Sequence, residues 1–486
     1  MKSKNIPFIL LVIFLSLVSC KVSKQSTMVY ISSEIEIADY NTVTDITEGD
    51  IYWHISVLAS DSMQGRKSAT HYEALAAEYI KERFELLGLK SFDDNYLQQV
   101  PIYSRKYFDD CKLYFNGYES NYPTDFKPMV MFDSLTISGE VAFAGYGYDS
   151  DYENLNVEGR WVMILENSNS ILYERKATAK DNGALGVLVI GMDGTSGDGR
   201  YVRPSDSVPM IKISRELADH LFSIACTNVS EVLKKVEANE SQDITIPTVV
   251  RGTIKAVTQP VTSQNVVAYL EAGNSESENG YIVVGAHYDH IGTETVGDSL
   301  QIFNGADDNA SGVAGLLEIA EKMCGEKNLK YNVIFVAFGA EELGLIGSNY
   351  FCNNPPVPIE DIKLMVNLDM IGRMDSNSRV YINTSEPDDK LNSVVDEVKG
   401  SHSGINAVFS FESFMRGSDH TPFHNKKIPV MFFLTGLHSD YHKPSDTIGL
   451  INLKGEKLLL DFVYDIIISP AMDDCIRSFT SSGENP

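Results

Sequence analysis

The second half of the chain alternates short apolar runs with longer segments of helical periodicity, and this alternation limits the folds open to it. Runs that suit strands lie at residues 265–270, 281–286, 332–338, 363–368 and 430–434. Patterns that suit helices lie at residues 311–324, 390–399 and 453–468. Short apolar strands separated by helices are typical of a mostly parallel sheet with helices on its faces. We therefore predict an α/β fold with a mostly parallel central sheet covered by helices.

The length, charge and cysteine content of the chain narrow its class. Its 486 residues exceed what one hydrophobic core normally serves, so two domains are expected. The formal net charge of −27 would repel a phosphate backbone, which argues against a nucleic-acid partner. The six cysteines show no CxxC spacing, and this excludes a zinc ribbon or a dense disulfide framework. We expect a globular protein of two domains that does not bind nucleic acid.

The N-terminal residues have the pattern of an export signal. Two lysines precede an apolar run that is too short to span a bilayer comfortably, so residues 1–19 are interpreted as a signal peptide. The run ends in Leu-Val-Ser-Cys, which resembles a bacterial lipobox and implies lipidation at Cys20. An ordinary secretory signal that is cut nearby is the alternative. We expect an exported bacterial lipoprotein, periplasmic or at the cell surface, that is held to the membrane by a lipid anchor and a polar tether at residues 20–47.

Polar side chains follow the ends of several predicted strands, which is where open α/β sheets bind their ligands. His287 and Asp289 follow the run at 281–286, and strand alternation turns both toward the same face. Later runs are followed by Glu341, Glu342, Asp369 and, across a loop, His442. The adjacent residues Asp307 and Asp308 precede a predicted helix. We expect these segments to deliver two histidines and three carboxylate ligands to one edge of the sheet.

Two histidines and three carboxylates are a donor set that suits a pair of zinc ions. Zn²⁺ takes imidazole and carboxylate ligands in four-coordinate sites, and two ions about 3.5–4 Å apart need one bridging group. A water held between them would have a lowered pKa and would need a base to accept its proton. Glu341 is placed for this role, because its neighbour Glu342 can bind metal while Glu341 faces the substrate. Spacing alone does not decide whether Asp307 or Asp308 is the ligand.

Five ordered segments carry these residues, namely GAHYDHIG, NGADDNASGVAGLLEIA, FVAFGAEELGLIGS, VNLDMIGR and YHKPSDT. Together they resemble the co-catalytic dizinc peptidases, a family of exported aminopeptidases, glutamate carboxypeptidase-like enzymes and transferrin-receptor-like proteins. The resemblance implies two Zn²⁺ per chain, with Asp308 as the bridging ligand, Glu341 as the general acid/base and Asp289 orienting His287. The metal ligands that it implies are His287, Asp308, Glu342, Asp369 and His442.

Residues 119–243 interrupt this pattern. The segments FAGYGY, YENLNVEGRWVMIL and KATAKDNGALGVLVI resemble the protease-associated domain that many exported peptidases carry as an insertion. The resemblance implies a smaller α+β domain that acts as a lid or a substrate-access module, and a structural insert without a function of its own is the alternative. The zinc peptidase domain would then comprise residues 48–118 and 244–475, followed by a C-terminal tail at 476–486.

The contiguous residues Ser418, Asp419 and His420 superficially offer the components of a serine hydrolase. Contiguous residues cannot place a nucleophile, a base and an orienting group in line, and the chain has neither GxSxG nor HExxH. The segment instead resembles the SDHxPF loop that lies near the substrate pocket of the dizinc peptidases. This resemblance implies that Ser418 and Asp419 contact the substrate. Arg416 is a further candidate, as the contact for a substrate carboxylate.

These observations predict a membrane-tethered zinc exopeptidase that acts on peptides, with an aminopeptidase favoured. A pocket with many carboxylates suits the α-ammonium group of a peptide, whereas a carboxypeptidase would need a cation such as Arg416. The alternatives are a carboxypeptidase of the same family, a glutaminyl cyclase with one zinc ion, and a receptor-like protein without catalysis. The sequence indicates neither the side-chain preference nor the oligomeric state.

Overall fold

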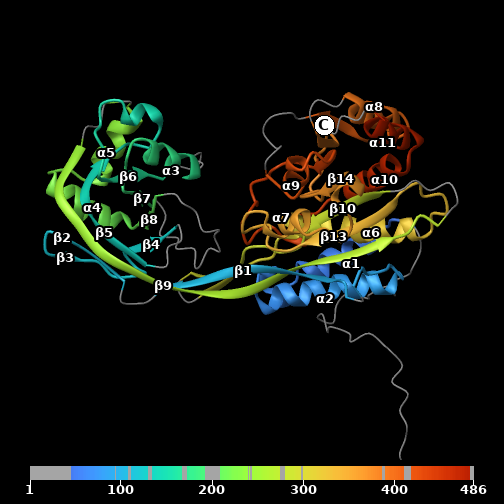
Figure 1. Ribbon diagram of the computed structural model, residues 1–486, viewed down its shortest axis with the longest axis horizontal. Helices are drawn as coiled ribbons and strands as arrows, with labels where there is room; N and C mark the ends of the chain where they lie inside the picture. Colours follow the sequence, from blue (N-terminus) through green and yellow to red (C-terminus); the bar gives the residue numbers. More distant parts are fainter. Residues whose placement is uncertain are drawn as a thin grey trace, which may run out of the picture. The chain divides into compact units, whose positions relative to one another are not determined.

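The fold is described from a computed structural model of the chain (Figure 1). The structure describes residues 45–93, 95–107, 111–129, 134–166, 172–191, 208–238, 240, 244–273, 280–296, 299–385, 389–409 and 417–481. The predicted signal peptide at 1–19, Cys20, residues 20–44 of the predicted tether and Arg416 lie outside these ranges. Every helix within the described ranges is too short or too polar to cross a membrane.

The sheet of the C-terminal part of the chain has a parallel centre. Strand β10 (Tyr281–His287) lies between β13 (Asn332–Phe338) and β14 (Ile362–Leu368) and pairs in parallel with both. The strands farther out are β17 (Val430–Leu434), β15 (Arg379–Thr384), β16 (Asn406–Phe409) and, beside β13, the long β9 (Ile244–Leu270). Strand β17 is parallel to β14, whereas β15 and β9 run antiparallel to their neighbours β17 and β13. The prediction of a mostly parallel central sheet is confirmed.

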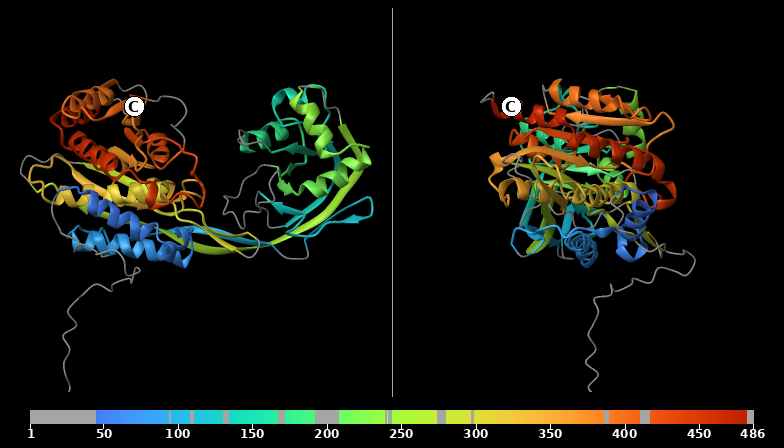
Figure 2. Two further views of the ribbon diagram at one scale, coloured as in Figure 1. Left: turned by 180° about the vertical axis from the view of Figure 1, so that it is seen from behind. Right: turned by 90° about the vertical axis from the view of Figure 1, so that its right-hand side faces the viewer.

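Helices pack on both faces of this sheet (Figures 1 and 2), and alternate side chains of the strands belong to different apolar cores. Val284 and Phe335 belong to one apolar core, which includes α1 (Glu48–Leu58), α2 (His71–Leu86), α6 (Gly312–Cys324), α8 (Asp389–Lys399), α10 (Leu453–Ile468) and α11 (Pro470–Ser481). Val283 and Ile334 belong to a second core, with α7 (Ile346–Asn353) and α9 (His420–Asn425). Because β10 and β13 are buried on both faces, their sequences are almost entirely apolar.

A second group of strands and helices has apolar cores of its own. It comprises β2 (Lys112–Phe115), β3 (Tyr118–Glu119), β4 (Phe126–Pro128), β5 (Ser134–Phe143), β6 (Trp161–Leu165), β7 (Gly186–Ile190), β8 (Met210–Ile213), α3 (Leu172–Asp181), α4 (Arg215–Ile224) and α5 (Val229–Glu237). Parallel pairing joins β5, β6, β7 and β8 in that order. Leu113 and Ile254 lie in one of its cores, so the packing of this group extends beyond the predicted limits of 119 and 243.

Two boundaries differ from those expected from the sequence. The sequence predicted only the last part of β9, because polar residues such as Thr262 and Ser263 interrupt its apolar pattern. The strand pairs with β5 along its first part, and with β13 and β1 (Leu97–Tyr107) along its last part. At the other end, α11 continues past residue 475, and Ile476 packs into the main core.

Candidate metal centre

The carboxyl ends of three parallel strands meet at one edge of the sheet. The pairing register places His287, the last residue of β10, beside Phe338, the last residue of β13. Asp369 directly follows β14 on the other side of β10, and Glu341 and Glu342 follow β13 after two intervening residues. The register of the strands therefore brings these side chains to the same place.

Asp308 reaches this edge from the turn that precedes α6. The side chain of Asn309 fixes the turn against the end of β14 through two hydrogen bonds. Its amide donates to the carbonyl oxygen of Leu368 (3.0 Å), and its oxygen accepts from the backbone N–H of Met370 (3.1 Å). The turn is thereby held with Asp308 beside Asp369.

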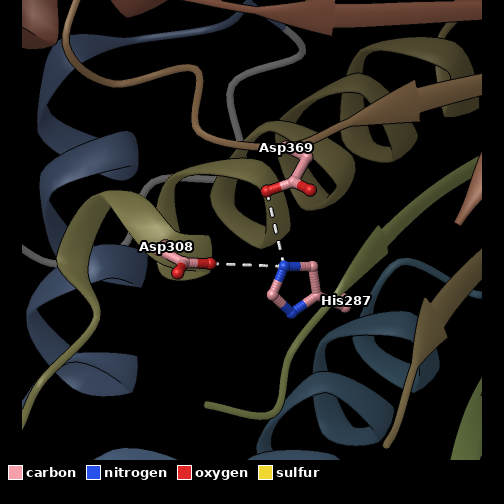
Figure 3. Close-up of side chains that lie close together, drawn as sticks. All are labelled: His287, Asp308 and Asp369. Carbon is pink, nitrogen blue, oxygen red and sulfur yellow. Dashed lines mark ion pairs between the residues drawn. The ribbon is translucent and has the colours of Figure 1, made fainter. Parts of the chain in front are cut away.

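A first cluster forms around the imidazole of His287 (Figure 3). Its Nε2 atom lies 3.4 Å from Asp308 Oδ1 and 3.4 Å from Asp369 Oδ1. Its Nδ1 atom lies 3.1 Å from the backbone carbonyl oxygen of Asp289, which can only accept, so Nδ1 carries the proton. Nε2 is therefore the ring nitrogen that faces the two carboxylates. Atoms bound to one tetrahedral zinc ion lie about 3.3 Å apart, which matches this spacing.

A second cluster forms around the other oxygen of Asp308. Nε2 of His442 lies 3.1 Å from Asp308 Oδ2 and 3.4 Å from Glu342 Oε2. His290 joins this cluster, with its Nδ1 atom 2.9 Å from Glu342 Oε1 and 3.6 Å from Asp308 Oδ2. Asp308 thus presents one oxygen to each cluster, as a bridging ligand does.

The arrangement of these groups fits a pair of divalent cations. Asp308 Oδ2 and His442 Nε2 are buried 3.1 Å apart, and neither makes a well-aligned hydrogen bond within the described residues. A buried polar atom without a partner costs free energy unless something else binds it. The mixture of imidazole and carboxylate donors is the one that zinc prefers in catalytic sites.

Asp289 supports the glutamates that follow β13. Its Oδ1 accepts from the backbone N–H of Glu341 (3.0 Å), and its Oδ2 accepts from the N–H of Glu342 (3.3 Å) and from the hydroxyl of Ser68 (2.6 Å). Its nearest carboxylate oxygen is 3.9 Å from Nδ1 of His287, so it is the backbone carbonyl of Asp289 that contacts the imidazole. Asp289 therefore holds the turn that carries Glu341 and Glu342.

The structure separates the roles of the two adjacent aspartates. The carboxylate of Asp307 faces away from both clusters: Oδ1 accepts from the backbone N–H of Gly372 (2.7 Å), and Oδ2 lies 3.1 Å from Nε2 of His438. The carboxylate of Asp446 accepts from the backbone N–H groups of Asp307 (3.0 Å) and Asp308 (3.1 Å). Asp308 is therefore the member of the pair that faces His287 and His442.

His442 lies on a loop after β17 that several polar contacts hold in place. Its backbone has a φ of 55°, in the left-handed region that residues other than glycine rarely adopt. Asp440, two residues earlier, accepts from the guanidinium of Arg373 (3.0 Å) and from the hydroxyl of Ser445 (2.8 Å). The ring of Tyr441 stacks on that of His442, with centroids 3.8 Å apart. These contacts fix the imidazole although it is partly exposed.

Arg66 lies fully buried behind the site and satisfies backbone carbonyl groups of three segments. Its Nε donates to the carbonyl of Tyr288 (2.8 Å), and its two Nη atoms donate to those of Leu58 (2.6 Å), Asn304 (2.7 Å) and Gly305 (3.0 Å). Tyr288 follows His287, and Gly305 begins the turn that carries Asp308. Burial lowers the pKa of Arg66 to about 10, which still leaves it positively charged at neutral pH.

The charges of the site shift its carboxyl groups in opposite directions. Burial would raise the pKa of Asp308, but the imidazole of His290 and its neighbours hold it well below the usual range. Burial and the charge of Asp308 likewise oppose ionisation of Glu342, yet hydrogen bonding to His290 lowers its pKa to about 2. Burial raises the pKa of Glu341 well above its usual range, and the charge of Glu342 adds to this. Asp308 and Glu342 are thus ionised, whereas Glu341 holds a proton readily.

The loop before α9 lies behind the ligands. The hydroxyl of Ser418 donates to Asp369 Oδ2 (2.6 Å) and accepts from the amide of Asn367 (2.7 Å). Asp419 is fully buried, and this burial raises its pKa to about 7. Both residues were expected to contact the substrate, and the structure places Ser418 in contact with a ligand carboxylate. Arg416, the third expected contact, lies outside the described residues.

A pocket opens onto the two clusters. Its polar lining residues are His287, Asp308, Glu341, Glu342, Asp369 and His442. The others are Gly417 and the apolar or aromatic residues Met370, Phe432, Leu434, Leu437 and Tyr441. The pocket therefore has both strongly acidic and apolar lining residues.

Comparison with known protein families gives a match over the residues that build this site. Residues 265–466 match the model of peptidase family M28. The chain contains a peptidase family M28 domain. The resemblance to a peptidase family that the five sequence segments carry is thereby confirmed for this part of the chain.

Curated relatives of the M28 domain are peptidases. Aminopeptidase YwaD of Bacillus subtilis is 27% identical over 319 residues, which cover 64% of this chain and 62% of that protein. The probable lipoprotein aminopeptidase LpqL of Mycobacterium tuberculosis is 26% identical over 229 residues, covering 46% of this chain and 38% of LpqL. The chain thus spans less than two thirds of the length of these relatives.

Solved structures share the fold over most of the chain. The aminopeptidase from Aneurinibacillus sp. strain AM-1 superposes with a TM-score of 0.60 at 22% identity, covering 88% of this chain and 94% of that one. BSAP, a zinc aminopeptidase from Bacillus subtilis, gives a TM-score of 0.59 at 21% identity, covering 87% and 95%. At this level of identity the likeness establishes a zinc aminopeptidase-like fold.

Two residues of the M28 domain site were not expected from the sequence. His290 lies three residues after His287, beyond the end of β10, where strand alternation no longer predicts its direction. Arg66 lies more than two hundred residues before the segments that it joins, in a stretch without apolar periodicity. The one signal for His290 was its place in the segment GAHYDHIG, which already held a candidate ligand.

Arg66→Met should destabilise the protein by about 3 kcal/mol or more, because the carbonyl groups of Leu58, Tyr288, Asn304 and Gly305 would lose a charged donor. Arg66→Lys should restore only part of this loss, since an ammonium group has three donors and lacks the planar guanidinium geometry. The measurement is the midpoint of urea unfolding. Arg379→Met, which removes an exposed pair with Asp375 (2.6 Å), is the control and should leave the midpoint unchanged. Equal midpoints for both methionine variants would contradict the role given to Arg66.

Proposed function

We propose that this chain is a zinc-dependent aminopeptidase that removes N-terminal residues from peptides. The observation that carries the proposal is the carboxylate of Asp308, which presents one oxygen to each of two clusters of imidazole and carboxylate groups. One zinc ion would be held by His287, Asp308 and Asp369, and the other by Asp308, Glu342 and His442. Two zinc ions so placed would polarise a peptide carbonyl and make a bound water more acidic.

The residues of the chain would supply the positioning and the proton transfer. Glu341 lines the pocket next to the ligands, and the carboxylate of Asp289 fixes its backbone. Its raised pKa suits a group that accepts a proton from the attacking water and passes it to the leaving amine. A base that is adjacent in sequence to the ligand Glu342 keeps the proton close to the reacting carbonyl.

The walls of the pocket favour a free N-terminus and an apolar first residue. The acidic residues that line the pocket would attract the α-ammonium group of a peptide. The apolar lining residues Met370, Phe432 and Leu434 would accept an apolar side chain. None of the described residues that line the pocket is a lysine or an arginine, which a carboxypeptidase would need for the terminal carboxylate. These features support aminopeptidase activity over carboxypeptidase activity.

We also propose that the protein is an exported lipoprotein and that residues 119–243 form a protease-associated domain inserted into the peptidase domain. The lipobox-like segment ending at Cys20 supports the first proposal, and a relative named as a lipoprotein aminopeptidase is consistent with it. The separate apolar cores and the parallel strands β5, β6, β7 and β8 support the second.

Glu341→Gln should lower kcat by a factor of about 10² to 10⁴, because the amide cannot take part in general acid–base catalysis. The variant should still bind two zinc ions per chain, since Glu341 is not one of the proposed ligands. Metal analysis and steady-state kinetics on zinc-loaded protein test this. Glu360→Gln, at an exposed position away from the pocket, is the matched control and should keep wild-type activity. An unchanged rate for Glu341→Gln would remove it from the mechanism.

A panel of blocked peptides tests the direction of cleavage. Zinc-loaded protein should cleave Leu-Ala-Ala with a free or amidated C-terminus and should not cleave the N-acetylated peptide. A peptide that begins with aspartate should have a kcat/KM at least tenfold lower. The acidic residues of the pocket would repel its side-chain carboxylate, and the apolar residues would not solvate it. Cleavage that requires a free C-terminus instead would establish a carboxypeptidase, and cyclisation of N-terminal glutamine with one zinc ion per chain would establish a glutaminyl cyclase.

Cys20→Ala should release the full-length protein from the membrane fraction of the bacterium that expresses it, because acylation requires the thiol. Fractionation followed by immunoblotting measures this. Cys111→Ala is the control, since Cys111 is buried within the described part of the chain, and should leave the protein with the membranes. Membrane association of the Cys20→Ala variant would contradict the lipid anchor.

A further inference from the structure

We propose that His290 is a positioning residue that orients the Glu342 carboxylate and thereby strengthens binding of the second zinc ion. The inference rests on the proposed zinc-dependent function, and it assigns a role to a residue outside the expected ligand set. It depends on three observations: the enclosure of the imidazole, its single hydrogen bond, and the way the two oxygens of Glu342 are divided between His290 and His442.

The imidazole of His290 is enclosed on several sides. Its side chain is buried, and its backbone N–H donates to the carbonyl oxygen of Arg66 (3.3 Å). Gly305 lies against the ring so closely that a Cβ there would stand 2.6 Å from Cδ2 of His290. The ring of His442 meets it edge to face, with centroids 5.7 Å apart. The imidazole of His290 therefore has little space in which to move.

Glu342 is the hydrogen-bond partner of this ring. Nδ1 lies 2.9 Å from Glu342 Oε1, whereas Nε2 is buried and has no partner among the residues that the structure describes. Because an ionised carboxylate only accepts, Nδ1 must carry the proton and donate it to Oε1. A protonated Nδ1 has no lone pair to give to a metal ion.

The distances also distinguish His290 from His442. The 2.9 Å between Nδ1 of His290 and Glu342 Oε1 is an ordinary hydrogen-bond length, and Asp308 Oδ2 is 3.6 Å away from the same nitrogen. Nε2 of His442 lies at 3.1 and 3.4 Å from Asp308 Oδ2 and Glu342 Oε2. Those two distances are near the spacing of about 3.3 Å expected for atoms on one tetrahedral zinc ion. His442 is therefore positioned as a metal ligand, whereas His290 is positioned to support the ligand Glu342.

The consequence concerns the second cation rather than the first. Glu342 has one oxygen on His290 and the other toward His442, so the hydrogen bond from His290 fixes which oxygen faces the metal. Without it, the carboxylate would be free to turn away from the nearby charge of Asp308. Loss of a group that orients a metal ligand typically weakens metal affinity by about 10–100-fold. Asp308 turns Oδ1 toward His287 and Oδ2 toward His290, whose Nδ1 is 3.6 Å away, so the first cluster should keep its affinity.

The test compares His290→Leu with His290→Asn in the full chain. Leucine fills the space without a donor, whereas the asparagine amide places an N–H donor near the position of Nδ1. The readout is the zinc content and the two zinc dissociation constants, measured by competition with a chromophoric chelator, together with the thermal unfolding midpoint of the metal-free protein. His402→Leu is the control, because it removes a histidine–carboxylate contact of similar length (2.8 Å, to Asp465) away from the site.

We expect His290→Leu to weaken the second zinc ion by 10–100-fold with the first unchanged, and His290→Asn to recover most of that loss. His402→Leu should bind both ions as the wild type does. If the wild type binds two zinc ions and His290→Leu has the same two dissociation constants, the role of His290 is overturned and the proposed function is left intact. Loss of the second ion in both His290 variants would overturn positioning in favour of direct ligation. A wild type that binds fewer than two ions would overturn both proposals.

Discussion

The convergence of carboxylates on one pocket is the constraint on which the rest of the site depends. Asp308, Glu342 and Asp369 meet there with Glu341. Two like charges 4 Å apart repel by about 4 kcal/mol at an effective dielectric constant of about 20. Imidazoles separate the acids, and the buried guanidinium of Arg66 lies behind them. Although burial opposes it, the carboxylates raise the pKa of His287 and of His442, so the site requires positive charge among its acids, which protonated imidazoles or bound cations would supply.

Much of the support for the ligands acts on the backbone rather than on their side chains. Asp289 accepts from the N–H groups of Glu341 and Glu342, and Asp446 accepts from that of Asp308. Arg66 donates to the carbonyl of Tyr288, just after His287, and to that of Gly305, shortly before Asp308. Each of these contacts fixes the backbone at or near a proposed ligand residue. The side-chain atoms that face the metal site take no part in them. The ligand positions are therefore set by folding, and binding a cation requires little further ordering of the chain.

The residues of the site that could be predicted from the sequence are those that closely follow a predicted strand. A largely apolar run fixes where β10, β13 and β14 end, and parallel pairing brings those ends together, so His287, Asp369 and the glutamates could be located in advance. The choice between Asp307 and Asp308 depends on the path of one turn, which Asn309 sets through contacts with a strand that follows much later. Arg66 could not be found for the same reason, because its partners are distant backbone carbonyls, which carry no residue-type signal.

The two clusters differ in which parts of the fold set their geometry. His287 and Asp369 come from the ends of adjacent central strands, whose register leaves little freedom. His442 comes from a loop, its side chain is 37% exposed, and its left-handed backbone costs on the order of 1–3 kcal/mol. The pairing of Asp440 with Arg373 and the stacking of Tyr441 must offset that cost. The geometry of the second cluster therefore depends on tertiary contacts of one loop, whereas that of the first follows from the sheet itself.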